Sequence, residues 1–387
     1  MLKMIKSLIC IYFAGLICLL MGCSRPNVVS STAAEVIDFG NLKSVNAAEL
    51  ISVCSYVALE SSENSLVGNI GQIEICGNRI YILDNKMNTF NVFGMDGKFV
   101  MKLEGHGNGP GEFISPHSFW IDKHGHVLIL DRQLNRLLKY RLTDLKYIGD
   151  VTLPAPSPLS FAAMQDSGMY IYYYPLRQND VFSGKQFVVA NEKGDVVRTF
   201  YDAPLTGKIL HGCPANFYMF NESLRVYPYF SNQVYELSGN SFDACYEFSW
   251  GKLKFPPLEL FQKHDTSGDV MKEILTGEND WIRLLYVYET NQMLVVKYYI
   301  KRDLYLSIRD KKENRTVNVK SDMIVDDLGL GGRFPLPMAV CDGLFVGAIT
   351  PFDVVKEDVQ DKRLEDLLDS KSEESNPILV FYRYLTI

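Results

Sequence analysis

The stretch 80–97, IYILDNKMNTFNVFGMDG, has a second copy in the chain at 127–145, VLILDRQLNRLLKYRLTDL. In each copy an apolar run ends at an aspartate, Asp84 or Asp131, and a second apolar run follows a short polar turn. The two aspartates are 47 residues apart. Aspartate favours such a turn because its carboxylate can accept hydrogen bonds from nearby backbone N–H groups. Each copy therefore predicts antiparallel strands joined by tight turns.

This strand–turn–strand pattern recurs more loosely in the rest of the chain, at 169–200, 224–250, 293–319 and 344–384. Repeats of about 40–50 residues built from short strands are typical of β-propellers, which have about 4–8 blades. The two clear copies and the four looser ones together make six blades. The sequence thus predicts an all-β fold, a six-bladed β-propeller with short helical insertions.

Two segments that interrupt the strands carry the helical insertions. The segment 257–275 places Leu258, Phe261 and Ile274 on a plausible apolar stripe. The segment 353–375 is acidic and polar, with a few leucines among the charges. We interpret it as a helix with a solvated face inside the last blade, and an acidic docking surface is the alternative.

A propeller must close its ring, because an open blade leaves an unpaired strand edge. The run 377–385, PILVFYRYL, is a strong strand pattern at the C-terminus. The run 51–59, ISVCSYVAL, alternates with period two near the start of the folded part. We expect these two strands to share the last blade and thereby close the ring.

Four glycines occupy every second position in the stretch 104–113, EGHGNGPGEF. A dinucleotide-binding turn needs G-x-G-x-x-G between a strand and a helix, but no helical pattern follows these glycines. Without a helix N-terminus, the dipole and the free N–H groups that hold a phosphate are missing. We interpret the stretch as a joint between the first two blades, in which glycines allow positive φ at several points.

The joint also carries a family resemblance. Residues 107–113, GNGPGEF, the Asp-Gly-Lys turn at 96–98 and the Leu-Asp pairs of both repeats resemble the NHL-like six-bladed β-propeller lipoproteins of gut anaerobic bacteria. The match is good over the first two blades and architectural over the other four. The resemblance implies a fold, a place in the cell envelope and structural roles for these residues, more than an activity.

The N-terminus has the pattern of a bacterial lipoprotein signal. Lys3 and Lys6 precede the apolar run 7–21, which is too short to span a bilayer comfortably and fits a signal peptide. The run leads into LMGC at 20–23, which resembles a lipobox with Cys23 as the lipidated residue. The alternative is an ordinary signal peptide in which Cys23 stays unmodified.

We therefore predict a signal peptide at 1–22, a lipidated Cys23 with a flexible tether over 23–46, and the propeller over 47–387. Acyl chains would tether the protein to a membrane without spanning it. Ser24 suits transfer to the outer membrane. The residues after Cys23 lack the acidic cluster of surface-exported lipoproteins, so we expect the periplasmic face of that membrane rather than the cell surface.

The cysteine pattern favours neither a disulfide framework nor a metal site. Five cysteines remain after the signal peptide and Cys23, namely Cys54, Cys76, Cys213, Cys245 and Cys341. An odd, scattered set is not a framework, and the lack of C-x-x-C excludes the usual zinc and thioredoxin-like patterns. We expect most of these to be buried thiols. One bridge between Cys54 and Cys76 is the alternative.

Charge and motifs exclude several classes of function. A net charge of −7 and the lack of a basic patch argue against nucleic acid as a partner. The sequence has no metalloprotease, serine-hydrolase or phosphate-loop motif. The pair His124 and His126 fits a solvated turn better than a metal site. We therefore name no catalytic residue, no metal ligand and no cofactor.

The geometry of a propeller suggests where a ligand could bind. The inner strands of all blades begin near the central channel, so side chains at these positions come together there. We predict ligand contacts from His117, Trp120, Arg283 and Arg333. Arg333 lies in the turn GGRFP, which would hold a bidentate donor in place. Trp120 could stack on a sugar ring, and the alternative is that it fills space between blades.

These observations predict a lipid-anchored binding or scaffold protein of the cell envelope, with a glycan, a peptide or an envelope protein as its partner. An envelope hydrolase or lyase with a site at the channel mouth is the alternative, since propellers can gather catalytic side chains without a local motif. A third hypothesis is an assembly platform beside a membrane transporter. Acidic or histidine side chains with shifted pKa values at the channel would favour the enzyme, whereas aromatic and arginine side chains would favour binding.

Overall fold

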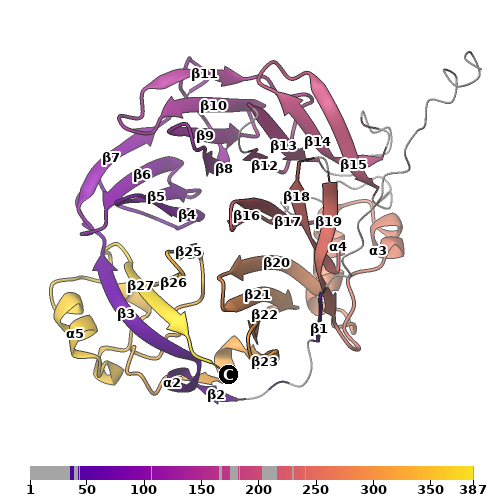
Figure 1. Ribbon diagram of the computed structural model, residues 1–387. Coiled ribbons are helices and arrows are strands. Elements are labelled where there is room, and N and C mark those ends of the chain that lie inside the picture. The colour runs from indigo at the N-terminus through magenta and orange to yellow at the C-terminus, as the bar shows by residue number, and fades with distance from the viewer. Residues whose placement is uncertain are drawn as a thin grey trace, which may run out of the picture. The chain divides into compact units, whose positions relative to one another are not determined.

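The computed structural model describes residues 35–38, 42, 44–105, 107–164, 168–174, 182, 184–202, 216–228, 231–239 and 241–386. Within the compact unit Ala34–Ile387, the described strands form six blades of four antiparallel strands each, arranged in a ring around a central axis (Figure 1). The predicted six-bladed β-propeller is therefore confirmed. The predicted signal peptide and Cys23 lie outside the described residues.

The first three blades follow one another along the chain, each from its inner to its outer strand. Blade one is β4 (Gln72–Cys76), β5 (Arg79–Asp84), β6 (Thr89–Gly94) and β7 (Phe99–Glu104). Blade two is β8 (Pro116–Ile121), β9 (His126–Asp131), β10 (Arg136–Arg141) and β11 (Tyr147–Val151). Blade three is β12 (Ser160–Ala163), β13 (Met169–Tyr173), β14 (Lys185–Asn191) and β15 (Val196–Asp202).

The last three blades are built in the same way, and the sixth is shared by the two ends of the chain. Blade four is β16 (Asn216–Phe220), β17 (Ser223–Tyr227), β18 (Gln233–Ser238) and β19 (Ser241–Ser249). Blade five is β20 (Ile282–Glu289), β21 (Met293–Ile300), β22 (Asp303–Asp310) and β23 (Arg315–Lys320). Blade six is β25 (Ala339–Cys341), β26 (Leu344–Ile349), β27 (Ile378–Tyr384) and β3 (Ile51–Ala58).

The hydrophobic core lies between the blades, because each sheet is covered on both faces by its neighbours. In β5 the residues Ile80 to Leu83 are all buried, although their side chains alternate between the two faces. A strand that is buried on both faces reads as a continuous apolar run, which is why the repeated runs were visible in the sequence. Phe90, Phe119 and Tyr140 belong to the cluster that joins blades one and two.

The ring is closed as predicted, by pairing strands from the two ends of the chain. β27 pairs antiparallel with β3, from Ile378 opposite Ala58 to Tyr384 opposite Ile51. A second contact reinforces this joint. The buried side chain of Asn376 accepts a hydrogen bond from Val67 N (2.8 Å) and donates to the carbonyl oxygens of Glu60 (2.5 Å) and Ser65 (2.7 Å).

The segment 23–46, predicted as a flexible tether, contains two short strands in its described part. β1 (Glu35–Asp38) pairs parallel with the outer strand β19, and β2 (Val45–Asn46) pairs parallel with β24 (Ile324–Val325). These pairings correct the tether prediction for these residues, since β1 adds a fifth strand to the sheet of blade four and β2 forms a separate two-stranded sheet with β24. The strands have only four and two residues, so they leave no clear periodic signal in the sequence.

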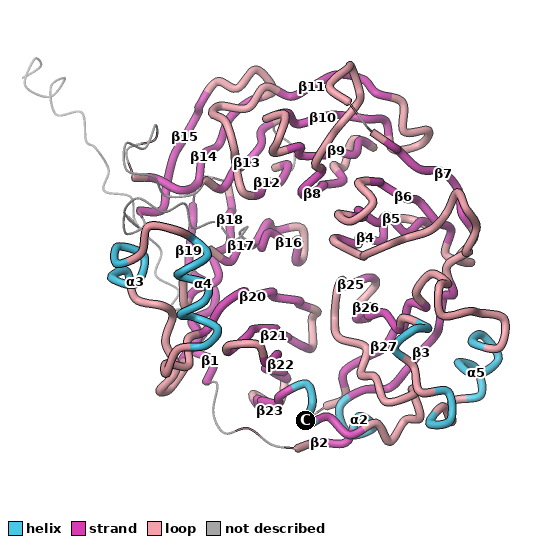
Figure 2. Tube along the Cα trace, turned by 180° about the vertical axis from the view of Figure 1, so that it is seen from behind, coloured by secondary structure: helices cyan, strands magenta, loops and turns pink. Residues whose placement is uncertain are grey.

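The predicted helical insertions are present (Figure 2). The first contains α3 (Leu258–Lys263) and α4 (Ser267–Thr276), which pack around Phe261 and Ile274. The second contains the short 3₁₀ turns η2 (Pro351–Asp353) and η3 (Lys356–Asp358) and the helix α5 (Lys362–Leu368). Two further short elements are α2 (Ala47–Leu50) and η1 (Ser321–Met323). None of the helices among the described residues is long and apolar enough to cross a membrane.

The glycine-rich stretch is a joint between blades one and two, as interpreted, but its glycines act differently from the expectation. Among its described glycines only Gly111 has a positive φ, of 73°. Gly105 is needed for close approach, because a Cβ there would lie 2.7 Å from the backbone nitrogen of Phe113. Phe113 itself is fully buried in the cluster between the two blades.

The cysteine expectations are partly wrong. Among the described residues Cys54, Cys76, Cys245 and Cys341 are free thiols, and the first two are exposed. The alternative of a bridge between Cys54 and Cys76 is therefore wrong. Cys54 lies on the outermost strand of blade six, whereas Cys76 ends the innermost strand of blade one. Strand-like sequence around a cysteine does not show which face of the strand carries the thiol.

Candidate functional site

A pocket of about 180 Å³ lies where the inner strands of blades one to four end at the channel. Its lining comes from the last residues of these strands and the turns after them: Glu74, Cys76, Trp120, Ile121, Asp122, Lys123, Ala163, Met164 and Met219. The sequence prediction placed the site at the beginning of the inner strands. The pocket lies at their opposite ends.

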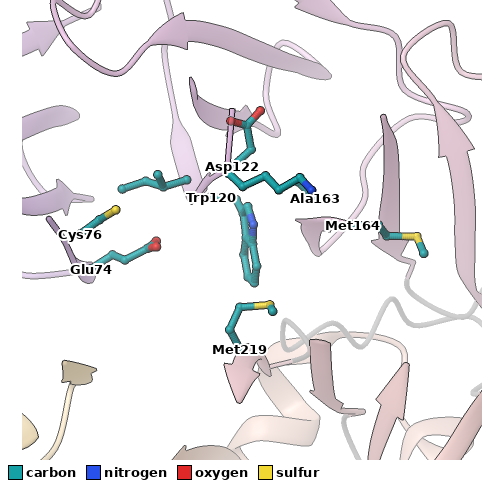
Figure 3. A pocket seen from close by; sticks show the side chains of 9 residues that line it. Glu74, Cys76, Trp120, Asp122, Ala163, Met164 and Met219 are labelled. Carbon is teal, nitrogen blue, oxygen red and sulfur yellow. The ribbon is translucent and has the colours of Figure 1, made fainter. Parts of the chain in front are cut away.

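The Trp120 indole stands in the middle of this pocket (Figure 3). Glu74 and Cys76 lie on one side of the ring, Met164 on the other side, and Met219 near its edge. Trp120 also packs against the cores on both sides of blade three. One part of the Trp120 ring fills space between blades and another part lines the pocket, and its stacking on a ligand stays a prediction.

Glu74 is positioned by a regular contact between two inner strands. Two residues before it, Gln72 donates to Phe119 O (2.8 Å) and accepts from Phe119 N (2.9 Å). Glu74 points the same way on β4 and its carboxylate bonds to the backbone of Ile121. The side chains of alternate β4 residues thus extend the hydrogen bonding of blade one to the inner strand of blade two.

The surroundings of Glu74 favour its neutral form. Removal from bulk water by the surrounding strands raises the pKa of Glu74 from 4.5 to about 8, and the hydrogen bond from Ile121 opposes this only in part. Burial, and in second place the Glu74 charge, also raise the pKa of the Cys76 thiol. At neutral pH the pocket therefore contains a protonated carboxyl group and a protonated thiol.

The second carboxylate of the pocket, Asp122, forms its hydrogen bonds within its own turn. Asp122 accepts hydrogen bonds from the backbone N–H groups of His124 (2.8 Å) and His126 (2.9 Å). Its other oxygen lies 2.9 Å from Nδ1 of His126. This geometry agrees with the interpretation of His124 and His126 as turn residues. Among the described residues, no group of three or more His, Cys, Asp and Glu side chains could hold a metal ion.

His117 lies on the same strand as Trp120, near its beginning, and outside the pocket lining. Its ring bonds to the backbone of Leu159, which precedes the inner strand of blade three. Burial and the nearby charge of Arg132 lower the pKa of His117. His117 thus joins inner strands much as Gln72 does. Whether it also contacts a ligand stays a prediction.

The two predicted arginines lie away from the pocket lining and from each other. Arg283, at the start of β20, donates to Lys301 O (2.8 Å) and lies 5.1 Å from the ring centre of Tyr299. Arg333 is exposed and donates to Asp353 O (3.1 Å), in the insertion of blade six. Of the four predicted ligand residues, Trp120 is the one that lines the pocket.

Sequence reasoning missed Glu74, Met164 and Met219. Each lies near the end of an inner strand or just after one. A usable signal was present in β4, where Gln72, Glu74 and Cys76 alternate with two isoleucines. This alternation places two polar side chains and a thiol on one face of an inner strand.

A second polar cluster, between blades four and five, also left no signal in the sequence. The fully buried Glu289 carboxylate contacts Arg225 Nη1 (2.6 Å) and Lys311 Nζ (2.5 Å). The hydroxyl groups of Tyr218 and Tyr246 donate to it at 3.0 and 2.6 Å. Every partner belongs to the protein itself, so the cluster ties two blades together and leaves no place for a ligand at the carboxylate.

Two solved structures from Bacteroides share this architecture. One is a Bacteroides fragilis protein classed as exported, with 23% identity and a TM-score of 0.79 over 91% of this chain and 100% of that chain. The other is a Bacteroides vulgatus member of the DUF4221 family, with 9% identity and a TM-score of 0.57 over 88% and 99% of the two chains. At these identities the likeness shows the fold alone. No curated protein matches the sequence significantly.

The family assignment rests on the sequence match. Residues 25–348 match the family DUF5128, described as a 6-bladed beta-propeller. This range covers most of the chain and includes blades one to five with the first strands of blade six. The chain belongs to this family of six-bladed β-propellers.

Proposed function

We propose that this chain is a lipid-anchored protein of the bacterial cell envelope that binds a glycan, a peptide or an envelope protein through its central channel. The lipobox-like sequence before Cys23 supports the anchor. The similar Bacteroides fragilis protein, which is classed as exported, supports an address outside the cytoplasm. The periplasmic face of the outer membrane remains our proposed location.

The observation that carries the binding function is the Trp120 pocket. An indole with thioether side chains beside it offers a broad apolar contact surface, and Met219 is 36% exposed. Aromatic rings contribute large binding energies with little loss of side-chain freedom, and methionine adapts its shape to the ligand. Inner strands from four blades hold these residues, so the pocket is built on rigid elements.

An envelope hydrolase or lyase is the second candidate, and the raised pKa of Glu74 favours it. A carboxyl group with a pKa of about 8 can donate a proton near neutral pH. Such reactions commonly use a second carboxylate, however, and Asp122 in this pocket is held by two backbone N–H groups and a histidine ring. The geometry therefore supports binding better than turnover.

Binding is tested with the full chain, purified in detergent, on glycan and peptide arrays. We expect a ligand whose retention is lost in Trp120→Ala. Trp281→Ala is the matched control, because Trp281 packs beside α3 and α4, outside the pocket lining. A ligand retained equally by both variants would contradict the channel as the site. Release of a product from the ligand would instead favour the enzyme.

The anchor is tested separately from the binding site. Cells are labelled with an alkyne-bearing palmitate analogue, and wild type is compared with Cys23→Ala. We expect label and membrane association for the wild type alone. Resistance of the wild type to protease added to intact cells would support the periplasmic face, and rapid cleavage would place the protein on the surface.

A further inference from the structure

We propose that the channel pocket selects ligands that carry an ammonium group, which would lie between the Trp120 indole and the Glu74 carboxylate. This inference rests on the proposed binding function and names the chemistry of its ligand. It begins with the direction of Glu74. The side chain reaches from the inner strand of blade one toward the Trp120 ring in the pocket (Figure 3).

Glu74 is a carboxylate without a cationic partner among the described residues. Its surroundings contribute burial and one backbone hydrogen bond from Ile121, and no nearby lysine, arginine or histidine offsets its charge. Lys123 also contributes to the pocket lining. A cation that enters with a ligand would therefore supply the interaction that the protein does not provide.

The same fold shows what such a site looks like when a cation is present. Between blades four and five, the ring of Phe220 lies 4.4 Å from the Arg225 guanidinium and 4.1 Å from the Lys311 ammonium group. Both cations also contact the Glu289 carboxylate. An aromatic face beside a buried carboxylate thus holds cations elsewhere in this protein, as expected from cation–π attraction.

The channel pocket also combines an aromatic ring, Trp120, with a carboxyl group, Glu74. Trp is the best of the aromatic side chains for a cation–π contact, and the thioethers of Met164 and Met219 are soft and polarisable. The pocket volume of about 180 Å³ is below the range of about 300–1,000 Å³ for sites that enclose a drug-sized ligand. It therefore suits one terminal group, such as a lysine side chain or the ring of an amino sugar.

Binding of an ammonium group would be coupled to the protonation of Glu74. The titratable and charged groups around this carboxyl are Cys76, Tyr81, Asp122 and Lys123. With a pKa of about 8, Glu74 is mostly protonated at pH 7, so a cation must displace the proton. We expect about one proton to be released per ligand at pH 7, and affinity to rise about tenfold from pH 7 to pH 9.

The experiment compares charged probes with neutral probes of nearly the same shape, using the full chain in detergent and isothermal titration calorimetry. Lysine amide with an acetylated α-amine is compared with its diacetylated form, and glucosamine is compared with N-acetylglucosamine. These two pairs distinguish a peptide source from a sugar source. The trimethylated lysine amide serves for the pH series, because its charge does not titrate.

We expect at least one charged probe to bind about tenfold or more tightly than its acetylated counterpart. Proton release is measured by repeating the titration in buffers of different ionisation enthalpy. In Glu74→Gln, which keeps the shape of the side chain, the preference, the proton release and the pH dependence should all be lost. A single cooperative thermal unfolding transition, as in the wild type, confirms that this variant folds.

Three outcomes would overturn the inference. The first is equal affinity for charged and acetylated probes, and the second is a pH dependence that persists in Glu74→Gln. The third is no detectable binding of any charged probe at millimolar concentration. A neutral array ligand that requires Trp120 but ignores Glu74→Gln would leave the proposed function intact while this inference fails.

Discussion

The joint between blades one and two and the joint between blades four and five both bury a carboxylate, but they neutralise it in different ways. Asp131 accepts hydrogen bonds from the backbone N–H groups of Ile114 (2.6 Å), Ser115 (3.0 Å) and Leu134 (2.9 Å). Glu289 is surrounded instead by two cationic side chains and two tyrosine hydroxyls.

The two carboxylates differ in where their partners come from. Asp131 is held by backbone groups near the end of its strand, whereas Glu289 is held by side chains from several strands. Backbone N–H groups are present whatever the sequence, so one aspartate at the end of a strand suffices to hold the next turn and the preceding loop. Asp84 repeats this arrangement, with Lys86 N at 2.8 Å, Met87 N at 2.9 Å and Gly68 N at 2.5 Å. The Glu289 cluster requires specific side chains from several strands, and the loss of the Glu289 carboxylate removes the acceptor that two cations and two tyrosine hydroxyls share.

The largest expected effect is therefore at Glu289. Glu289→Gln leaves Arg225 and Lys311 largely buried beside a neutral amide, and should lower the free energy of unfolding by about 3–5 kcal/mol. Urea unfolding, followed by circular dichroism, measures this loss. The control is Glu236→Gln, which removes the more exposed partner of the same arginine and should cost about 1 kcal/mol or less. Equal losses for the two variants would contradict a buried cluster.

At the local joint we expect a smaller loss. Asp131→Ala leaves three backbone N–H groups without their acceptor and should destabilise the protein by about 2–3 kcal/mol in the same assay. Asp131→Asn keeps one acceptor oxygen and should cost less than the alanine variant. If the asparagine variant lost as much as the alanine variant, the negative charge rather than the number of acceptors would hold the turn.

This contrast explains why most of the fold was predictable from the sequence. The second strand of each early blade is buried on both faces and ends in an aspartate whose role is local, so Asp84 and Asp131 mark the repeat directly. The closing pair β3 and β27 was also visible, because β27 is an apolar run and β3 alternates with period two. The short strands β1 and β2 were missed, since their pairing depends on the partners β19 and β24 rather than on their own patterns.

The candidate site was less predictable for a related reason. A side chain can be assigned to an inner strand from sequence, as Trp120 was, but the end of the channel at which a pocket forms depends on how four blades meet. Glu74 and Met219 lie on inner strands that are far apart in the sequence. The Glu289 cluster is the extreme case, because its four partners come from four different places in the chain.

The joint that closes the ring, between blades six and one, shares one feature with the Asp131 joint and one with the Glu289 cluster. Asn376 is a single buried side chain, yet all its side-chain partners are backbone groups of the segment 60–67. Asn376→Ala should lower the free energy of unfolding by about 2 kcal/mol, between the losses expected for Asp131→Asn and Glu289→Gln. Ser372→Ala, an exposed change in the same loop, is the control. A loss equal to that of the control would show that the strand pair β3–β27 closes the ring unaided.

An effect of opposite sign is expected at the third kind of carboxyl group, Glu74, which has neither three backbone donors nor a cationic partner among the described residues. Because its pKa is raised from 4.5 to about 8, the folded protein keeps a proton that the unfolded chain releases in this range. The stability contributed by this group therefore falls as pH rises from about 5 to 8. Glu74→Gln, which cannot ionise, should be more stable than wild type at pH 8 and indistinguishable from wild type at pH 4.5. Urea unfolding at the two pH values measures the difference. A variant less stable than wild type at pH 8 would show that the Glu74 charge is already stabilised in the folded protein, as it is at Asp131 and Glu289.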